Sequence, residues 1–300
     1  METVHLLGEH AALIGILTRP DTPAAAGSVA VILLNSGLQH RVGPFRLYVE
    51  LARKLADHGF PVLRIDQSGK GDSERRKGLS FPESIEADFR DAAGFLAETV
   101  QAERIIVIGL CSGADDALYI ASRSAQAAGV VLLDGYAART AKYYMRHYGP
   151  RMLKVASWRG FVMRFLGNIA IAAGIRRLPR ASEPSVDLID FQVPAGRKEM
   201  RARFVSAIRH DAKLLCVFTS GVEDYYNHYG QLADWLGPVC RNHITEVFIE
   251  GAEHTYPLAV HRNELISTIC NWVGREFPAA EPVSSLHGTQ SGLLFSRHVY

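Results

Sequence analysis

The chain has 300 residues, of which 48% are hydrophobic and 21% are charged, and its formal net charge is +2. This balance excludes disordered and fibrous proteins and is typical of a globular protein with either one α/β domain and an insertion or two domains. Four widely spaced cysteines without a CxxC pair (Cys111, Cys216, Cys240 and Cys270) argue against a disulfide framework or a zinc site.

The N-terminal region contains two short apolar runs within residues 3–18, separated by Gly8-Glu9-His10. We expect an antiparallel strand pair there, which leads into a larger sheet. The same region has no basic segment before its apolar residues, so we predict no signal peptide. The later apolar segment Phe161–Ile175 is short and contains Arg164, which excludes it as a membrane span. The expected location is the cytoplasm.

Short apolar runs then alternate with amphipathic stretches along the chain. Consecutive apolar positions are typical of parallel strands that are covered on both faces. The predicted strands are Val29–Leu34, Pro61–Ile65, Arg104–Ile108, Gly129–Leu133, Leu214–Phe218 and Glu246–Ile249. The predicted helices are 44–59, 83–100, 112–125, 224–236 and 257–275. This rhythm predicts the α/β class, with a mostly parallel twisted sheet flanked by helices.

One segment interrupts the alternation and carries most of the positive charge. Residues 138–212 have a helical pattern rich in arginine and aromatic residues, so we predict a helical basic cap inserted into a core of 1–137 and 213–276. Between Ala138 and Lys213, 16 Lys and Arg residues against 5 Asp and Glu give a net charge of +11, and the remainder carries −9. Residues 277–300 read as a polar, loosely attached tail.

The strand 104–108 leads directly into Gly109-Leu110-Cys111-Ser112-Gly113 and then a helix. A nucleophile on such a sharp turn needs small residues two positions away on each side. Gly109 and Gly113 meet this requirement for Cys111, whereas the equivalent neighbours of Ser112 are Leu110 and Ala114. The spacing therefore favours Cys111 as the nucleophile, and the helix N-terminus favours its thiolate. Ser112 is expected to contribute its backbone amide to an oxyanion hole.

Two further strand ends carry the partners that such a nucleophile requires. The strand 214–218 is followed by Glu223 and Asp224, and the strand 246–249 is followed by His254. Ligands and catalysts gather beyond the carboxyl ends of strands in open α/β sheets. We therefore expect the triad Cys111, His254 and Asp224, with Glu223 as the alternative acid.

These motifs, over residues 1–276, resemble the α/β-hydrolase superfamily. Arg64–Ser73 (RIDQSGKGDS) is similar to its D-x-x-G-x-G-x-S loop, and Asp224 and His254 match its G-x-x-D and G-x-x-H motifs. The segment 34–38 (LNSGL) occupies the place of its His-Gly turn, which implies that Gly37 and Leu38 supply further oxyanion amides. The elbow cysteine is similar to that of dienelactone hydrolases, and the wider sequence looks like exosortase-system-associated hydrolases.

A cysteine nucleophile favours attack on an activated carbonyl and formation of an acyl-enzyme. We expect a hydrolase of an ester or acyl thioester (a thioesterase), with an acyltransferase to an amine or alcohol as the alternative and a non-catalytic scaffold as the second alternative. The basic segment makes an acyl-carrier protein or coenzyme A a candidate partner, whereas nucleic-acid-binding motifs are absent and no metal or cofactor is expected. Candidate substrate contacts are His40, Tyr143, Tyr144 and Trp158.

Overall fold

We analysed a computed structural model of the chain. The structure describes residues 1–8, 13–21, 28–152, 195–240 and 242–278. Within these residues, no helix combines the length and apolar character that crossing a bilayer requires.

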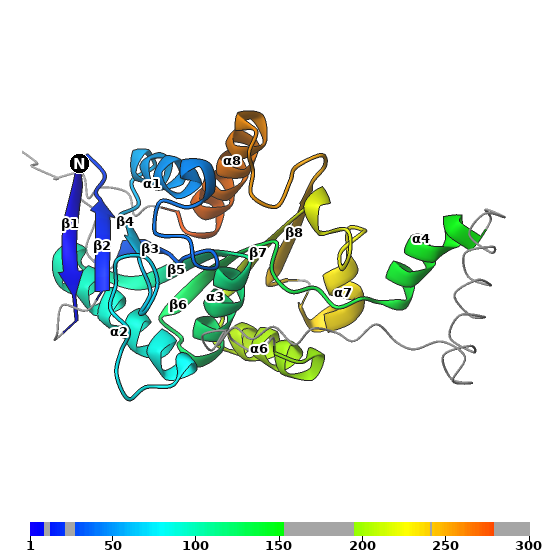
Figure 1. Cartoon of the computed structure of the whole chain (residues 1–300), viewed down its shortest axis with the longest axis horizontal. Helices are drawn as coiled ribbons and strands as arrows, with labels where there is room; N and C mark the ends of the chain where they lie inside the picture. Colours follow the sequence, from blue (N-terminus) through cyan, green and yellow to red (C-terminus); the bar gives the residue numbers. More distant parts are fainter. Residues whose placement is uncertain (9–12, 22–27, 153–194, 241, 279–300) are drawn as a thin grey trace, which may run out of the picture.

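An eight-stranded sheet organises the molecule, in the order β1-β2-β4-β3-β5-β6-β7-β8 (Figure 1). The first two strands pair antiparallel with each other, β2 pairs antiparallel with β4, and all remaining neighbours are parallel. The strands are β1 (Glu2–Leu7), β2 (Leu13–Thr18), β3 (Ser28–Leu33), β4 (Val62–Ile65), β5 (Ala102–Leu110), β6 (Ala127–Leu133), β7 (Lys213–Thr219) and β8 (Ile244–Ile249). The predicted fold class is confirmed, including the antiparallel pair at the start.

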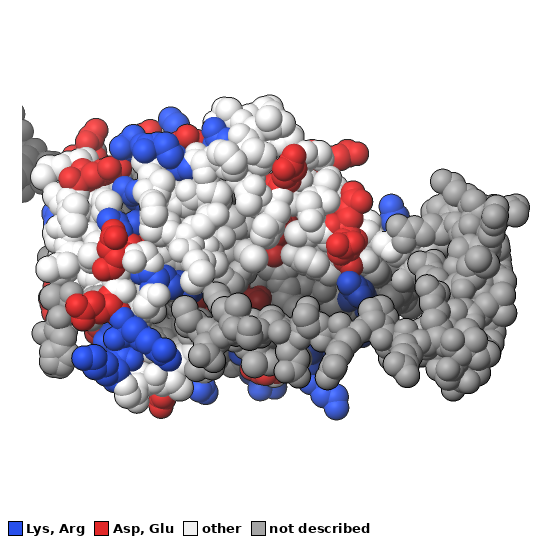
Figure 2. Space-filling view, in the orientation of Figure 1, with Lys and Arg blue, Asp and Glu red and all other residues white. Residues whose placement is uncertain are grey.

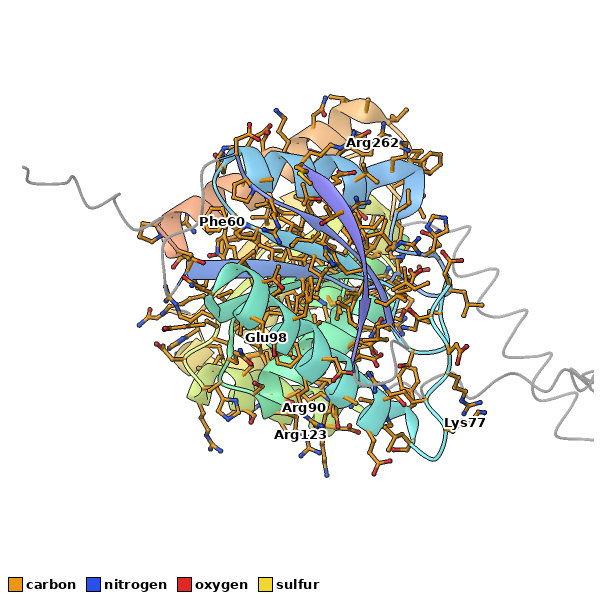
Figure 3. All side chains as sticks on the ribbon, turned by 90° about the vertical axis from the view of Figure 1, so that its left-hand side faces the viewer. Phe60, Lys77, Arg90, Glu98, Arg123 and Arg262 are labelled. Carbon is orange, nitrogen blue, oxygen red and sulfur yellow. The ribbon has the colours of Figure 1, made fainter. Side chains whose placement is uncertain are left out.

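Helices cover both faces of this sheet. On one face lie α1 (Leu47–Asp57), preceded by a short 3-10 turn (Pro44–Arg46), and α8 (Ala259–Glu276); on the other lie α2 (Phe81–Val100), α3 (Ser112–Arg123) and α6 (Arg197–Arg209). In Figure 3, Arg262 of α8 and Arg90 of α2 lie on opposite sides of the sheet. The two layers of apolar side chains explain why β3, β5 and β6 consist almost entirely of buried residues.

The segment predicted as a cap, 138–212, is described only at its two ends. Its first part contains α4 (Ala141–Met152), which extends away from the sheet (Figure 1). Its last part contains α6, whose residues Met200, Phe204 and Ala207 are buried in the same core as α3. The structure thus places α6 in the helical layer of the core, while residues 153–194 and most of the predicted tail lie outside the described residues.

The predicted helix at 224–236 is shorter than expected. Only α7 (Gln231–Leu236) is helical there, and Gly230 before it has a left-handed backbone with φ +84°. Residues 220–222 instead form a 3-10 turn, and the amides of Tyr225 and Tyr226 both donate to the carbonyl of Val222. A second 3-10 turn (Pro238–Cys240) follows α7. The sequence pattern therefore overestimated this helix because turns near the strand end already satisfy the backbone.

Candidate active site

The turn between β5 and α3 holds Cys111 in a backbone conformation that is rare for a residue with a side chain. Its φ of +58° and ψ of −120° place the exposed thiol at the carboxyl end of β5, at the N-cap of α3. The amide of Cys111 donates to the carbonyl of Leu133 at 2.9 Å, and buried Tyr48 accepts the amide of Leu110 at 3.1 Å. Such strain persists where the surroundings determine it, and it is concentrated at functional sites.

The two glycines of this turn explain why Cys111, and not Ser112, occupies the strained position. A Cβ on Gly109 would lie 2.0 Å from the carbonyl oxygen of Gly113, and a Cβ on Gly113 would lie 2.3 Å from that of Asn35. Both positions therefore exclude side chains, as a nucleophile elbow centred on residue 111 requires. Ser112 has already entered the first turn of α3.

His254 meets this turn from the loop after β8, and the carboxylate that binds it is Asp134. The distance from His254 Nδ1 to Asp134 Oδ2 is 2.9 Å, and the imidazole also makes a hydrogen bond with the thiol of Cys111. Because Nδ1 is bound to the carboxylate, Nε2 is the nitrogen that faces the thiol. The expectation that Asp224 binds His254 is wrong: the side chain of Asp224 is exposed, as is that of Glu223.

Asp134 is fixed by the strand next to its own. It follows β6 directly, has φ +47° and is only 3% exposed. Its Oδ1 accepts the amide of Thr219 and its Oδ2 the hydroxyl of Thr219, both at 2.8 Å. The hydroxyl of Tyr225 donates to the Asp134 carbonyl at 2.8 Å. None of these three residues was predicted from the sequence, although the position of Asp134 directly after the apolar run 129–133 was a signal for it.

The charges in this group favour an ion pair between the thiolate and the imidazolium. The hydrogen bond with Asp134, followed by that with Cys111, raises the pKa of His254 to about 10. The hydrogen bond from His254, supported by the amide of Ser112, lowers the pKa of the Cys111 thiol. The negative charge of Asp115 opposes this effect, and burial raises the pKa of Asp115 itself to about 6. The arrangement therefore places a thiol with a lowered pKa beside an imidazole that can carry a proton.

The residues predicted for the oxyanion hole line the same pocket as the thiol. The amide of Ser112 faces Cys111 and lowers its pKa, and both Gly37 and Leu38 line the pocket beside the thiol. Gly37 has φ +56°, and its amide donates to the hydroxyl of Ser112 at 2.9 Å. The Gly37 amide thus has an acceptor on the side chain that follows Cys111.

A buried polar clamp holds this loop in place. Fully buried Asn35 donates from Nδ2 to the carbonyl of Gln39 at 2.8 Å and to Asp66 Oδ1 at 2.9 Å, and it accepts the amide of Gln67 at 2.6 Å. Asp66 also accepts the amide and the guanidinium of Arg41. Asn35, which stands where many α/β-hydrolases have histidine, therefore ties the loop after β3 to the loop after β4.

The thiol opens into a pocket of about 1100 Å³. Apolar and aromatic side chains make up most of its walls, and three arginines and one lysine also line it. The apolar and aromatic lining residues are Leu38, Leu79, Phe81, Ile85, Tyr136, Ala137, Ala138, Tyr144 and Tyr225, and the basic ones are Lys70, Arg75, Arg139 and Arg197. Figure 2 shows a group of Lys and Arg side chains over the loop that precedes α2, which contains Arg75. The lining also includes the carboxylates of Asp88, Asp115 and Asp134, so the pocket combines apolar, basic and acidic side chains.

Two buried carboxylates, Asp116 and Asp88, are bound to residues that line the pocket. Asp116 accepts from Lys70 at 3.2 Å and from Gln67 at 3.0 Å, and Asp88 binds Ser68 and Arg76. In the part of the chain that the structure describes, no cluster of three or more His, Cys, Asp or Glu residues is arranged to hold a metal ion.

The predicted substrate contacts have different positions. Tyr144 lines the pocket and is partly exposed, whereas Tyr143 is buried and its hydroxyl donates to the Asp224 carbonyl. His40 is exposed, does not line the pocket, and accepts the amide of Val42 at 3.2 Å. Of the four predicted contacts, the pocket thus includes Tyr144 and excludes His40 and Tyr143, and Trp158 lies outside the described residues.

Solved structures of other proteins have the same fold. An esterase from Pyrococcus furiosus has a TM-score of 0.57 and 15% identity, and the match covers 92% of this chain and 90% of the esterase. A serine hydrolase homologue from Coxiella burnetii shares the fold with a TM-score of 0.54 and 12% identity, and the match covers 91% of this chain and 97% of the homologue. A serine hydrolase without a lid from Xanthomonas campestris has a TM-score of 0.51 and 16% identity, with 93% of this chain and 96% of that protein covered. No curated protein matches the chain.

These comparisons leave the likeness to dienelactone hydrolases and to exosortase-system-associated hydrolases as a prediction. Residues 27–188, more than half of the chain, match the family described as serine aminopeptidase, S33. The chain therefore belongs to the serine aminopeptidase S33 family of α/β-hydrolases.

Proposed function

We propose that this chain is a cysteine-dependent hydrolase of esters or acyl thioesters, with Cys111 as nucleophile, His254 as acid and base, and Asp134 as the group that orients His254. The observation that carries this proposal is the strained position of Cys111 at the elbow, with its thiol hydrogen-bonded to an imidazole whose other nitrogen binds a buried carboxylate. The family is named for serine enzymes. In this chain Cys111 stands at the elbow position where such hydrolases have their serine nucleophile.

The reaction follows from this geometry. The Cys111 thiolate attacks the carbonyl carbon, an S–C bond forms, and the carbonyl electron pair moves to the oxygen. As the intermediate collapses, the bond to the leaving alcohol or thiol breaks, and the leaving group takes the proton of the His254 imidazolium. Water then gives a proton to His254 and attacks the acyl-enzyme, which releases the carboxylic acid and regenerates the thiolate–imidazolium pair.

The decisive experiment is intact mass spectrometry during incubation with a short p-nitrophenyl ester and with a neutral acyl N-acetylcysteamine thioester. We expect a single acyl adduct, located on Cys111 by peptide mapping. Cys111→Ala should abolish both the adduct and turnover, whereas Cys240→Ala, a matched change at a buried cysteine, should leave both intact. Unchanged turnover in Cys111→Ala would refute the proposal and leave a scaffold role. Discharge of the adduct by added amines much faster than by water would identify an acyltransferase.

We further propose that the acyl group is carried on an anionic thioester, such as coenzyme A or the phosphopantetheine arm of a carrier protein. The support is the position of Arg75, Arg139 and Arg197, together with Lys70, in a pocket whose carboxylates number three, Asp88, Asp115 and Asp134. Asp88 is bound to Ser68 and Arg76, and Asp134 is bound to Thr219 and His254. Arg75 and Arg197 are exposed, and among the described residues neither pairs with a carboxylate, so each is available to a phosphate.

This second proposal is tested with matched substrates. The double variant Arg75→Gln/Arg197→Gln should raise KM for acyl-coenzyme A about five- to tenfold, since exposed charge pairs contribute about 0.2–1 kcal/mol each. It should leave KM for the neutral N-acetylcysteamine thioester unchanged. An exposed arginine away from the pocket, Arg53, provides the control Arg53→Gln. Equal effects of the double variant on both substrates would contradict an anionic carrier.

A further inference from the structure

The side chain of Ser112 connects the turn at Cys111 to the loop after β3, which contains Gly37. Its Oγ accepts the amide of Gly37 at 2.9 Å, across 75 residues of sequence, while its own amide faces the sulfur of Cys111. Ser112 also lines the pocket together with Gly37 and Cys111. The Gly37 amide, which the family motif assigns to the oxyanion, is therefore directed at this hydroxyl.

A hydroxyl that accepts one hydrogen bond still has a proton to donate. Among the described residues, no acceptor receives the hydroxyl proton of Ser112. Because the Gly37 amide already occupies one lone pair, it polarises the O–H bond and strengthens it as a donor. A polarised donor beside the thiol of Cys111, at the wall of a pocket, is what a developing negative charge on a carbonyl oxygen requires.

We infer that the Ser112 hydroxyl is a catalytic residue that donates a hydrogen bond to the oxyanion, and that Gly37 acts through it. This inference rests on the proposed function, because it assumes that the carbonyl carbon is attacked by Cys111. The oxyanion then has two donors from one residue, the amide and the hydroxyl of Ser112. Ser112 is not itself the nucleophile, since its backbone lies within α3 and only Cys111 has the elbow conformation.

The test compares two reactions of the same sulfur. Acylation by a p-nitrophenyl ester passes through an oxyanion, whereas alkylation by iodoacetamide displaces iodide at a saturated carbon and forms none. In Ser112→Ala we expect acylation of Cys111 to slow about a hundredfold, as for loss of one oxyanion donor. Alkylation should proceed at the rate of the unsubstituted protein, because the Ser112 amide and His254 still stabilise the thiolate.

Two further variants separate a chemical effect from a structural one. Ser112→Thr keeps a hydroxyl and should retain acylation within about tenfold. Ser122→Ala removes a hydroxyl that bonds only the local carbonyl of Tyr119 on the same helix, and it should leave both rates unchanged.

Equal slowing of acylation and alkylation in Ser112→Ala would overturn the inference, because it would indicate a structural role. Acylation at an unchanged or increased rate would also overturn it, since the hydroxyl would then be dispensable or would block the site. Both results differ from failure of the proposed function, in which the unsubstituted protein itself gives no acyl adduct on Cys111.

Discussion

Replacement of Asp134 by asparagine changes a single atom at the centre of the proposed triad. Thr219 holds the present carboxylate in one orientation, since its amide donates to Oδ1 at 2.8 Å. A backbone amide cannot accept, so in Asp134→Asn the oxygen of the new side chain must remain at the Oδ1 position and its nitrogen must replace Oδ2. That nitrogen then faces Nδ1 of His254, 2.9 Å away.

The consequence is a change of imidazole tautomer. To accept from the new amide, His254 must lose the proton on Nδ1 and carry it on Nε2, which faces Cys111. In that form the ring cannot take a proton from the thiol, and the hydrogen bond to a carboxylate, the main cause that raises the pKa of His254 to about 10, is gone. In the Ser-His-Asp enzymes the equivalent change costs about 10⁴-fold. A thiol depends less on its base than a hydroxyl does, so we expect about a thousandfold slower acylation, or about 4 kcal/mol in activation free energy.

The assay is the rate of acyl-adduct formation at pH 7 under single-turnover conditions, with thermal unfolding to verify that the variant folds. Asp224→Asn is the matched control, because it makes the same substitution at the exposed carboxylate that the sequence favoured. It should acylate at the rate of the unsubstituted protein. Acylation of the Asp134 variant within tenfold of that rate, or an equal loss in Asp224→Asn, would refute the tautomer argument.

Four other predictions address the electrostatics of the site and the space around two glycines. His254→Ala should lower turnover about a thousandfold and move the pH profile of Cys111 alkylation to higher pH, because the imidazole lowers the pKa of the thiol; an unmoved profile would contradict the ion pair. Asp115→Asn should move that profile to lower pH, since the carboxylate raises the pKa of Cys111. Gly113→Ala should lower the free energy of unfolding by about 2 kcal/mol or more in urea titrations, because its Cβ would meet a carbonyl oxygen at 2.3 Å. Gly94→Ala, in a helix with open space around its Cβ, should instead stabilise the protein by about 0.5–1 kcal/mol.

The sheet could be predicted from the sequence because its central strands are almost fully buried. Runs such as 104–108 and 129–133 are apolar at nearly every position, and a parallel strand covered on both faces explains such a run. The turn centred on Cys111 could also be predicted from the sequence, because the exclusion of side chains at Gly109 and Gly113 is a local property of the backbone. The antiparallel opening and the position of His254 beyond β8 follow from the same strand boundaries.

The acid could not be chosen from the sequence. Asp134 follows β6 and Asp224 lies beyond β7, and these strands are neighbours whose carboxyl ends share one edge of the sheet. The choice depends on the packing of the turn after β7: Gly221 approaches so closely that a Cβ there would lie 2.6 Å from the His254 amide. That turn supports the histidine with its backbone and leaves the carboxylate of Asp224 in solvent. No local pattern reports such a contact between distant loops.

The placement of the acid after β6 also connects α4 to the carboxylate that binds His254. Only six residues separate Asp134 from the start of α4, and the hydroxyl of Tyr143 in that helix is bonded to the carbonyls of residues 223 and 224, just beyond the turn that holds Thr219. α4 is therefore attached to both loops that meet at the acid: through the chain itself to Asp134, and through the Tyr143 hydroxyl to the loop after β7. An acid placed after β7 would have only the second connection, so the placement after β6 brings the start of the segment 138–212 next to the carboxylate that binds His254.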